Sequence, residues 1–319
     1  MKWKKAGRIF DPSAHEQPLG CREFAQSPQA IILDGRVRVV FSTRNRDATG
    51  QFLSQVACVD LSPDLSRILD VPKTPVIRLG DIGTFDEHGI FPLSPTQADG
   101  RILGYTSGWS RRVSVPVETS IGLCESFDGG RTFVRLGPGP VLTASPREPF
   151  LICDGLVRKF GGLFHMWYIF GQRWLPAAGA EPVARVYKIA HAVSRDGVEW
   201  RKEEGRAIIP DVLNADECQA LPSVLELDGR YHMVFCFRHA TDFRKNPARA
   251  YRLGYAWSND LSTWHRDDDA LGISPGTGDW DGEMMCYPHL CSSEGRVFLL
   301  YNGNEFGRHG FGYAELVGT

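Results

Sequence analysis

A repeated segment that ends in an aromatic residue constrains the fold of this chain more than any other feature of its sequence. Its clearest copies are Ser126–Phe133, Ser194–Trp200 and Ser258–Trp264, each with Asp two positions after the Ser. The aromatic residues at 133, 200 and 264 are 67 and 64 residues apart. Five units of about 64 residues fill a chain of 319 residues, so the spacing predicts five copies of one supersecondary unit.

Each unit contains four short segments that are typical of β-strands. A Pro-led apolar segment runs to an Asp-Gly or Glu-Gly pair, and a second apolar run follows, which is the pattern of a β-hairpin. These turns are predicted at residues 34–35, 99–100, 228–229 and 294–295, and at Asp154-Gly155 in the third unit. A third strand and the aromatic segment complete each unit, and Asp128 is expected to accept hydrogen bonds within its own turn. No stretch shows the period of 3.6 residues that marks an amphipathic helix.

The sequence therefore predicts an all-β chain, a five-bladed β-propeller that occupies residues 1–319 as a single domain. The last unit ends at Leu316 without a fourth strand, whereas Lys2–Pro12 matches the pattern of Glu199–Pro210. We expect the N-terminal segment to supply the missing outer strand of the last blade, because this closure removes an exposed sheet edge.

The composition excludes several classes of protein. The chain has 36 Lys and Arg against 38 Asp and Glu, a net charge of −2, so no overall basic field attracts nucleic acid or anionic lipid. No apolar run approaches the roughly 18 residues that span a bilayer, and the first ten residues lack the apolar core of a secretory signal. None of the eight cysteines forms a CxxC pair, which favours buried thiols over disulfides or zinc. We expect a cytoplasmic protein with no membrane span and no nucleic-acid partner.

Carboxylates recur near the start of the first strand in every predicted blade. They are Glu23, Asp86, Glu87, Glu148, Asp216, Glu217, Asp281 and Glu283. The first strands of a propeller line its central channel, and successive residues of a strand point to opposite faces. Each neighbouring pair should therefore offer one carboxylate to the channel.

Several carboxylates around one cavity suit the hydrolysis of glycosidic bonds. One carboxyl must stay protonated as the acid while another is ionised, and a separation of about 5–5.5 Å or roughly 6.5–9.5 Å selects retention or inversion. The predicted catalytic residues are Glu217 as general acid, Asp86 as base or nucleophile, and Glu283, which with Asp281 orients the substrate or tunes a pKa. The alternative is that these carboxylates cap turns or pair with arginines.

Further polar and aromatic residues recur near the ends of the second strands. The predicted substrate-binding residues are Gln26, Arg44, Trp109, Glu148, Arg173, Arg238, His239, Asp281, Asn302 and Asn304. Aromatic faces stack on sugar rings, and Arg, Asn and Gln bind hydroxyls or anionic groups. The cations indicate an acidic substituent such as phosphate or uronate, unless they only neutralise the carboxylates. No cofactor and no metal are expected; Ca²⁺ among the channel oxygens stays open, although no loop has EF-hand spacing.

This pattern resembles the five-bladed propeller glycosidases, namely arabinanases and xylosidases, invertase-type fructosidases and β-mannoside phosphorylases. The sequence is more closely similar to a bacterial group associated with polysaccharide and surface-glycan genes, which is related to the N-terminal domain of plant glucosamine inositolphosphorylceramide transferases. The closer match rests on Gly83–Asp86, Gly108-Trp109, Val115-Pro116, Trp167-Tyr168, Arg252–Tyr255, Trp280–Met284, Tyr287-Pro288, Tyr301–Asn304 and Gly310–Tyr313. In arabinanases the resemblance implies an Asp base, a second Asp that tunes a pKa and a Glu acid. The segment Arg147–Pro149 resembles the Arg-Asp-Pro of invertases with Glu148 in place of Asp, and no Asp of the first blade matches the usual base.

We therefore expect a glycan-active enzyme, a glycoside hydrolase or a relative that transfers a glycosyl group, acting on a carbohydrate or glycoconjugate. One alternative is a phosphorylase that binds phosphate through Arg44, Arg173, Arg238 and His239. Another is a non-catalytic carbohydrate-binding propeller that serves surface-polysaccharide assembly.

Overall fold

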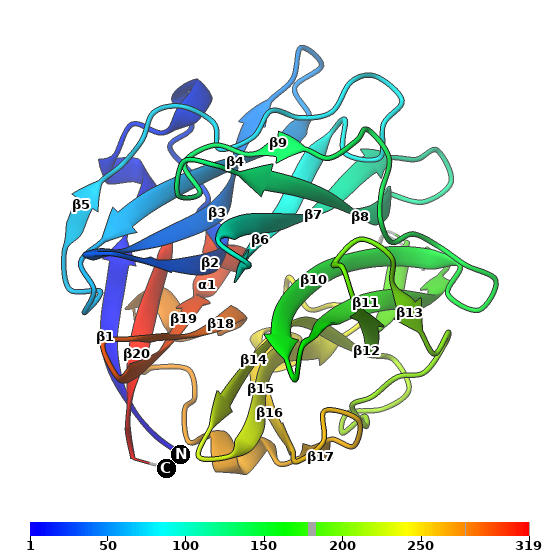
Figure 1. The fold of residues 1–319 in the computed structure, drawn as a ribbon. Coiled ribbons are helices and arrows are strands. Elements are labelled where there is room, and N and C mark those ends of the chain that lie inside the picture. Colours follow the sequence, from blue (N-terminus) through cyan, green and yellow to red (C-terminus); the bar gives the residue numbers. More distant parts are fainter. Residues whose placement is uncertain (178–182, 278, 319) are drawn as a thin grey trace.

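The computed structural model describes residues 1–177, 183–277 and 279–318, and within these ranges the chain is almost entirely β-structure (Figure 1). The helical segments described are short: η1 Pro12–Ala14, η2 Pro18–Gly20, η3 Pro247–Arg249, η4 Asp268–Leu271, η5 Asp279–Asp281 and the four-residue α1 Asn304–Gly307. The all-β prediction is confirmed, with these single turns as the exceptions to the expectation of no helix.

The strands recur in sets of four. The first strands are β2 Gln26–Leu33, β6 Gly89–Ala98, β10 Phe150–Phe160, β14 Glu217–Leu227 and β18 Cys286–Ser293. The second strands are β3 Arg36–Arg46, β7 Arg101–Arg111, β11 Leu163–Leu175, β15 Arg230–His239 and β19 Arg296–Asn302. The third strands are β4 Phe52–Leu61, β8 Val117–Ser126, β12 Ala184–Ser194, β16 Arg252–Ser258 and β20 Phe311–Gly318. The fourth strands are short, except for the N-terminal one: β5 Ile68–Asp70, β9 Val134–Arg135, β13 Arg201–Lys202, β17 His265–Arg266 and β1 Lys2–Phe10.

These strands form antiparallel sheets in the order in which they follow one another. Three sheets have four strands, in the orders β10-β11-β12-β13, β14-β15-β16-β17 and β18-β19-β20-β1. The fourth has eight, because a single parallel bridge between Ser54 of β4 and Gly89 of β6 joins β2–β5 to β6–β9. The first strands contact one another in sequence, and β18 in turn contacts β2, so they surround a common centre (Figure 1).

The N-terminal strand supplies the fourth strand of the last set, as the likeness of Lys2–Pro12 to Glu199–Pro210 predicted. β1 pairs antiparallel with β20, from Lys2 beside Gly318 to Phe10 beside Phe311. The two ends of the polypeptide consequently lie close together (Figure 1). The backbone groups along this edge of β20 are thus paired rather than open to another molecule.

Turn chemistry explains most of the hairpins. Both residues have positive φ in Asp99-Gly100, Asp228-Gly229 and Glu294-Gly295, the conformation that the tightest hairpin turns require. In the repeated outer turn, the Asp128 carboxylate accepts the N–H groups of Arg131 and Thr132 at 2.9 Å each, as expected.

The third unit corrects one prediction. Its hairpin turn is Gly161-Gly162, and Asp154-Gly155 lies inside β10. The pairing of β10 with β11 skips these two residues, between Cys153 and Leu156. The other first strands skip an X-Pro pair at the same place: Ser27-Pro28, Phe91-Pro92, Leu221-Pro222 and Tyr287-Pro288. Asp154-Gly155 is therefore the third unit's version of a recurring strand irregularity and not a turn.

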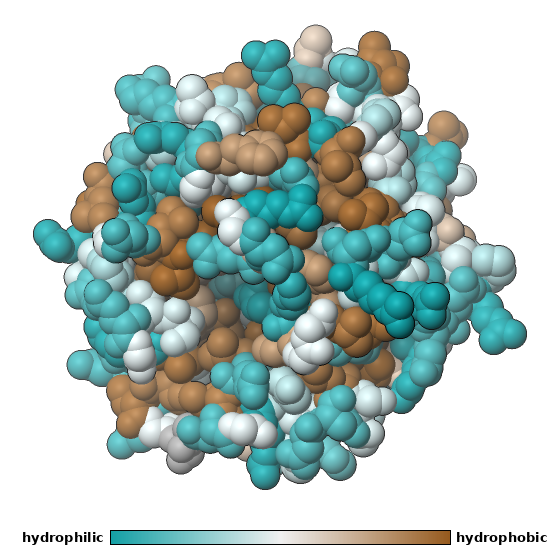
Figure 2. Space-filling model, viewed as in Figure 1, coloured by the Kyte–Doolittle hydropathy of each residue, from teal (hydrophilic) through white to brown (hydrophobic). Residues whose placement is uncertain are grey.

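Apolar side chains fill the space between the sheets, with Trp167, Tyr168 and Phe235 fully buried. All eight cysteines are free, and seven of them are buried. Figure 2 shows apolar side chains scattered among polar ones on the face viewed in Figure 1. None of the helices in the described ranges has the length and apolar character needed to cross a membrane.

Deleting residues 1–10 should lower the melting temperature and cause self-association, because it leaves the outer edge of β20 unpaired. Thermal unfolding and light scattering of the purified protein measure both effects. The control is Lys2→Gln, which changes an exposed side chain of β1 and keeps the strand. A truncated protein that stays monomeric and as stable as this control would contradict the structural role of β1.

Candidate active site

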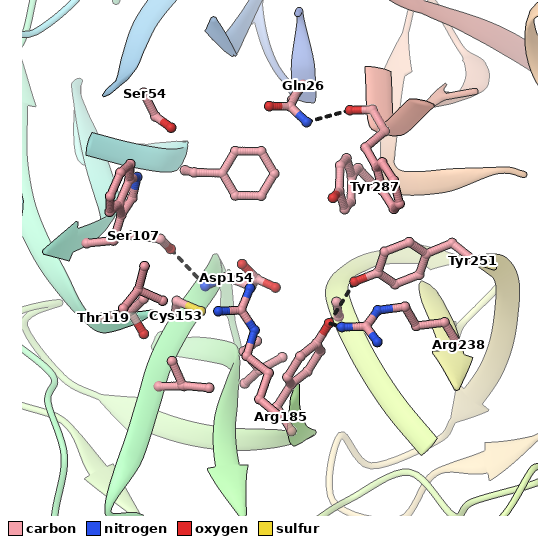
Figure 3. Close-up of a pocket in the computed structure, with 18 of the residues that line it drawn as sticks. Gln26, Ser54, Ser107, Thr119, Cys153, Asp154, Arg185, Arg238, Tyr251 and Tyr287 are labelled. Carbon is pink, nitrogen blue, oxygen red and sulfur yellow. Dashed lines mark hydrogen bonds between the residues drawn. The ribbon is translucent and has the colours of Figure 1, made fainter. Parts of the chain in front are cut away.

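A cavity of about 360 Å³ lies at the centre of the ring of first strands, a size suited to a small ligand. Aromatic rings make up much of its wall: Phe24, Phe52, Phe91, Trp109, Tyr187, Phe243, Tyr251, Tyr287 and Phe306. The charged residues that line it are Arg44, Arg185, Arg238, Arg244, Asp154 and Glu305. Figure 3 shows side chains from several sheets converging on this space. Its wall combines the apolar faces and the few polar groups that are typical of ligand sites.

Asp154 is the buried carboxyl of this cavity. The irregularity in β10 gives Asp154 a φ of 59°, and its side chain is only 6% exposed. Its N–H donates to Ser107 Oγ at 2.8 Å, and its Oδ2 accepts the Leu221 N–H at 3.2 Å. In Figure 3 the carboxyl faces the guanidinium of Arg185 across a short gap.

The surroundings of Asp154 favour its protonated form. Burial raises the pKa of the Asp154 carboxyl to about 7, and the Leu221 N–H and the charge of Arg185 oppose burial only in part. A carboxyl with a pKa near neutral pH can both give and take a proton under ordinary conditions. Asp154 therefore has the electrostatic character of a general acid.

The other lining carboxylate, Glu305, lies at the exposed rim. Arg308 donates to Glu305 Oε2 at 3.1 Å, and His309 lies 3.1 Å from Oε1. These partners lower the pKa of Glu305. Glu305 is therefore ionised at neutral pH, which leaves Asp154 as the proton donor among the lining carboxyls.

Hydrogen bonds fix one wall of the cavity. Arg238 Nη2 donates to the Tyr187 hydroxyl at 2.8 Å, and that hydroxyl lies 2.7 Å from the hydroxyl of Tyr251 (Figure 3). Arg238 Nη1 also donates to the His239 carbonyl at 2.7 Å. This network holds two phenol rings rigidly against the cavity.

The predicted catalytic carboxylates lie elsewhere. Asp86 and Glu217 are completely buried, and neither lines the cavity. Arg135 of β9 binds Asp86 at 2.5 Å, and Arg266 of β17 binds Glu217 at 2.6 Å. The expectation that both would face the channel is therefore corrected, because each points to a cation on the fourth strand of its own set.

The same ion pair recurs in two further units. Glu148 binds Lys202 of β13 at 2.5 Å, and Asp281 binds Lys5 of β1 at 2.7 Å. A tyrosine hydroxyl also donates to each of these carboxylates: Tyr168 to Glu148, and Tyr301 to Asp281. Four carboxylates that precede or open a first strand thus join that strand to the outermost strand of the same set. Pairing of these carboxylates with cations is the alternative to catalysis that the sequence had left open.

Glu217 is held ionised. Burial by itself would raise the pKa of its carboxyl, but hydrogen bonds from Arg266, Gln219 and the Val212 N–H outweigh burial and lower it. A carboxyl with a lowered pKa is a poor proton donor at neutral pH. Glu283 is exposed, and its backbone groups bind Asn304 and Arg252. The catalytic roles predicted for Asp86, Glu217 and Glu283 stay predictions to which this cavity adds no support.

The predicted substrate-binding residues divide into two groups. Gln26, Arg44, Trp109 and Arg238 line the cavity. The remaining ones, Glu148, Arg173, His239, Asp281, Asn302 and Asn304, are absent from its lining. Asn302 holds backbone groups of Ala25 and Gly310, and Arg173 pairs with Asp216 on an exposed surface.

Four charged lining residues, Asp154, Arg185, Arg244 and Glu305, were not predicted from the sequence. Asp154 had been assigned to a turn, although counting back from Gly161-Gly162 places Asp154-Gly155 where the other units have X-Pro. Arg185 and Arg244 lie outside the repeated pattern that located the other candidates. In the part of the chain that the structure describes, no group of three His, Cys, Asp or Glu side chains could hold a metal ion.

Comparison with solved structures identifies the class of fold. A structure described as a glycoside hydrolase aligns with a TM-score of 0.72 at 14% identity, over 99% of this chain and 93% of that one. A structure from the GH130 family of mannoside phosphorylases, described as containing glycoside hydrolases that target β-1,2 mannosidic linkages in Candida mannan, aligns at 0.71 and 14%, over 98% and 93%. An endo-arabinase from Bacteroides thetaiotaomicron aligns at 0.61 and 13%, over 98% of each chain. The protein therefore has the fold of the propeller glycosidases.

Comparison of sequences identifies the family to which the protein belongs. It is 36% identical over 324 residues to the uncharacterized protein Rv1502 of Mycobacterium tuberculosis, and the match covers 99% of both sequences. The chain therefore belongs to the same family as Rv1502. No family model matches it.

Replacing Glu217 by Ala should lower the free energy of unfolding by about 3 kcal/mol, because it removes the buried carboxylate that binds Arg266 and leaves that guanidinium only its more exposed partner Asp268. Urea unfolding followed by tryptophan fluorescence measures this change. Glu226→Ala on the same strand is the control, since Glu226 is exposed and its loss should change stability by less than about 0.5 kcal/mol. Equal stabilities of the two variants would show that the buried pair is not structural.

Proposed function

We propose that the protein is a glycan-active enzyme that breaks or transfers a glycosidic linkage in the central cavity, with Asp154 as general acid. The observation that carries this proposal is a carboxyl with a pKa near 7 inside a cavity walled by aromatic rings. Breaking a glycosidic bond requires a proton for the departing oxygen, and a carboxyl that stays protonated near neutral pH supplies one.

The wall of the cavity supports a carbohydrate ligand. Trp109, Phe91 and Tyr287 offer faces for the C–H groups of a sugar ring. Gln26, Ser54 and Thr119 offer polar groups to hydroxyls, and Gln26 Oε1 is buried with no hydrogen-bond partner among the described residues. A sugar would supply both the apolar surface and the missing partner.

The proposed reaction begins with proton transfer from Asp154 to the glycosidic oxygen while the bond from that oxygen to the anomeric carbon breaks. An acceptor then attacks the anomeric carbon. If the acceptor is water, a second carboxylate is needed to activate it, and Glu305 is the one that the cavity lining provides.

Phosphorolysis is the second candidate function. Phosphate is already an anionic nucleophile, so it attacks the anomeric carbon without a second carboxylate. One buried acid beside several arginines fits this reaction as well as hydrolysis. The dependence of turnover on added phosphate separates the two reactions.

We also infer that the five sets of strands are five blades of one propeller domain spanning residues 1–319. The closed order of contacts among the five first strands and the pairing of β1 with β20 support this inference. The closer kinship with the plant transferase group and a cytoplasmic role in polysaccharide synthesis remain proposals from the sequence.

Asp154→Asn should reduce turnover by at least about 1,000-fold, because the variant has lost the group that donates the proton. The assay is release of reducing sugar or sugar phosphate from a panel of glycans, with and without phosphate. Asp99→Asn is the matched control, since Asp99 lies in an exposed turn that readily accepts Asn.

Unchanged turnover in a folded Asp154→Asn variant would remove Asp154 from the mechanism. Glycan binding without any turnover by the unmodified protein would replace the enzyme proposal with the carbohydrate-binding alternative.

A further inference from the structure

Four arginines from three different sheets converge on the cavity. Arg44 lies near the end of β3, Arg185 near the start of β12 and Arg238 near the end of β15, and Arg244 follows β15. None of them forms an ion pair with any residue in the described ranges, whereas the arginines of the structural pairs each bind a carboxylate. Within the described residues, the cavity therefore gathers four cationic groups that no carboxylate pairs at salt-bridge distance.

The lining carboxyls do not balance this charge. Asp154 is partly protonated near neutral pH, and Glu305 already binds Arg308. The ordinary pKa of a guanidinium lies above 12, so all four arginines stay charged. The net charge of the cavity wall is consequently positive.

The guanidinium groups are close enough to repel one another. Burial lowers the pKa of Arg244, and the charges of Arg238 and Arg185 lower it further. Burial lowers the pKa of Arg44 in the same way, and the charge of Arg244 adds to this effect. Like charges held together away from water are unfavourable unless an anion joins them.

Hydrogen-bond donors in this cluster also lack acceptors. The Nε atoms of Arg44 and Arg238 are buried and have no partner among the described residues. Arg238 is only 3% exposed, so bulk water does not readily satisfy it. A buried donor without an acceptor costs free energy that a bound oxyanion would recover.

Aromatic rings hold two of the guanidinium groups in place. Arg44 lies 4.8 Å from the ring centre of Phe24, and Arg244 lies 4.4 Å from that of Phe243. Stacking occupies the flat face of a guanidinium and leaves the N–H groups at its edge free. The positions are thus fixed before any ligand binds, which lowers the entropic cost of binding.

We propose that the cavity contains a phosphoryl-binding subsite in which Arg44, Arg185 and Arg244 bind the oxygens of one tetrahedral oxyanion. This inference deepens the proposed function, on which it rests, by naming the group that accompanies the sugar. Several guanidinium forks that approach from separate sheets suit the oxygens of a phosphoryl group, which point in different directions. The phosphoryl group belongs either to the glycan substrate, as a phosphate ester, or to free phosphate that serves as the acceptor.

Calorimetric titration of the full-length protein with inorganic phosphate, glucose 1-phosphate, glucose and glucuronate tests this subsite. Inorganic phosphate should bind, and Arg185→Gln and Arg244→Gln should each weaken its binding at least tenfold. Arg296→Gln is the matched control, because Arg296 pairs with Glu315 at the surface and its loss should leave binding unchanged. Arg185 has no hydrogen bond from its side chain to another described residue that folding would lose, so the variant should remain folded.

The probes distinguish the two sources of the phosphoryl group. Tighter binding of glucose 1-phosphate than of inorganic phosphate supports a phosphorylated substrate, and equal or weaker binding supports free phosphate. The subsite is rejected if neither phosphoryl probe binds, if glucuronate binds more tightly than both, or if the two cavity variants bind phosphate as well as Arg296→Gln does.

The binding test of the subsite does not depend on whether the protein turns over a glycan. Asp154→Asn should bind phosphate at least as tightly as the unmodified protein, because it removes a carboxyl that carries negative charge in part at neutral pH. A protein that binds phosphate but cleaves no glycan would contradict the proposed function and leave the subsite in place. A protein that cleaves glycans but binds no oxyanion would contradict the subsite and leave the proposed function in place.

Discussion

A buried ion pair within each of four strand sets is the interaction on which the rest of the structure depends. In each case a carboxylate near the beginning of a first strand binds a cation on the fourth strand, as Glu217 binds Arg266 and Glu148 binds Lys202. The pair ties the innermost strand to the outermost one across the whole width of the set. Because removing one partner of such a pair leaves an uncompensated buried charge, this contact sets both the position and the stability of the strands around the cavity.

This pairing also determines the chemistry of the cavity. The carboxylates used between the strands are not available to a ligand at the centre, so one buried carboxyl, that of Asp154, faces a cluster of arginines there. Burial that is not offset by a salt bridge keeps the pKa of Asp154 near neutral pH, whereas Arg266 keeps the pKa of Glu217 low. The pKa values of two carboxyls in neighbouring units are thus shifted in opposite directions by their immediate surroundings.

The sequence was sufficient to predict an all-β chain with repeated sets of strands, and it named only some of the residues that line the cavity. The spacing of Phe133, Trp200 and Trp264 predicted the repeated strands. The likeness of Lys2–Pro12 to Glu199–Pro210, together with the missing fourth strand of the last unit, predicted that β1 completes the set that contains β20. The structural ion pairs also have a sequence signal, since Arg135, Lys202, Arg266 and Lys5 each stand two positions after the repeated aromatic residue. The regular position of these cations predicts that the carboxylates bind the outer strands and do not face the channel.

The site was harder to predict for two physical reasons. The direction of the Asp154 side chain depends on an irregularity in β10, where the alternation of strand faces breaks down. Arg185 and Arg244 have no ion pair with the described residues, and this depends on which carboxylates lie near them in space, which neighbours along the sequence do not reveal. Gln26, Arg44, Trp109 and Arg238, which the sequence predicted to bind substrate, do line the cavity, and they lie near strand ends.

The most direct test of this account is the pKa of Asp154 itself, measured by ¹³C NMR of aspartate carboxyl carbons and assigned with the Asp154→Asn variant. Burial disfavours the charged form, so the resonance missing from the variant should titrate with a midpoint near pH 7, protonated below it and ionised above it. A midpoint near the ordinary aspartate value of about 4 would contradict the account, because Asp154 would then hold no proton to donate at neutral pH.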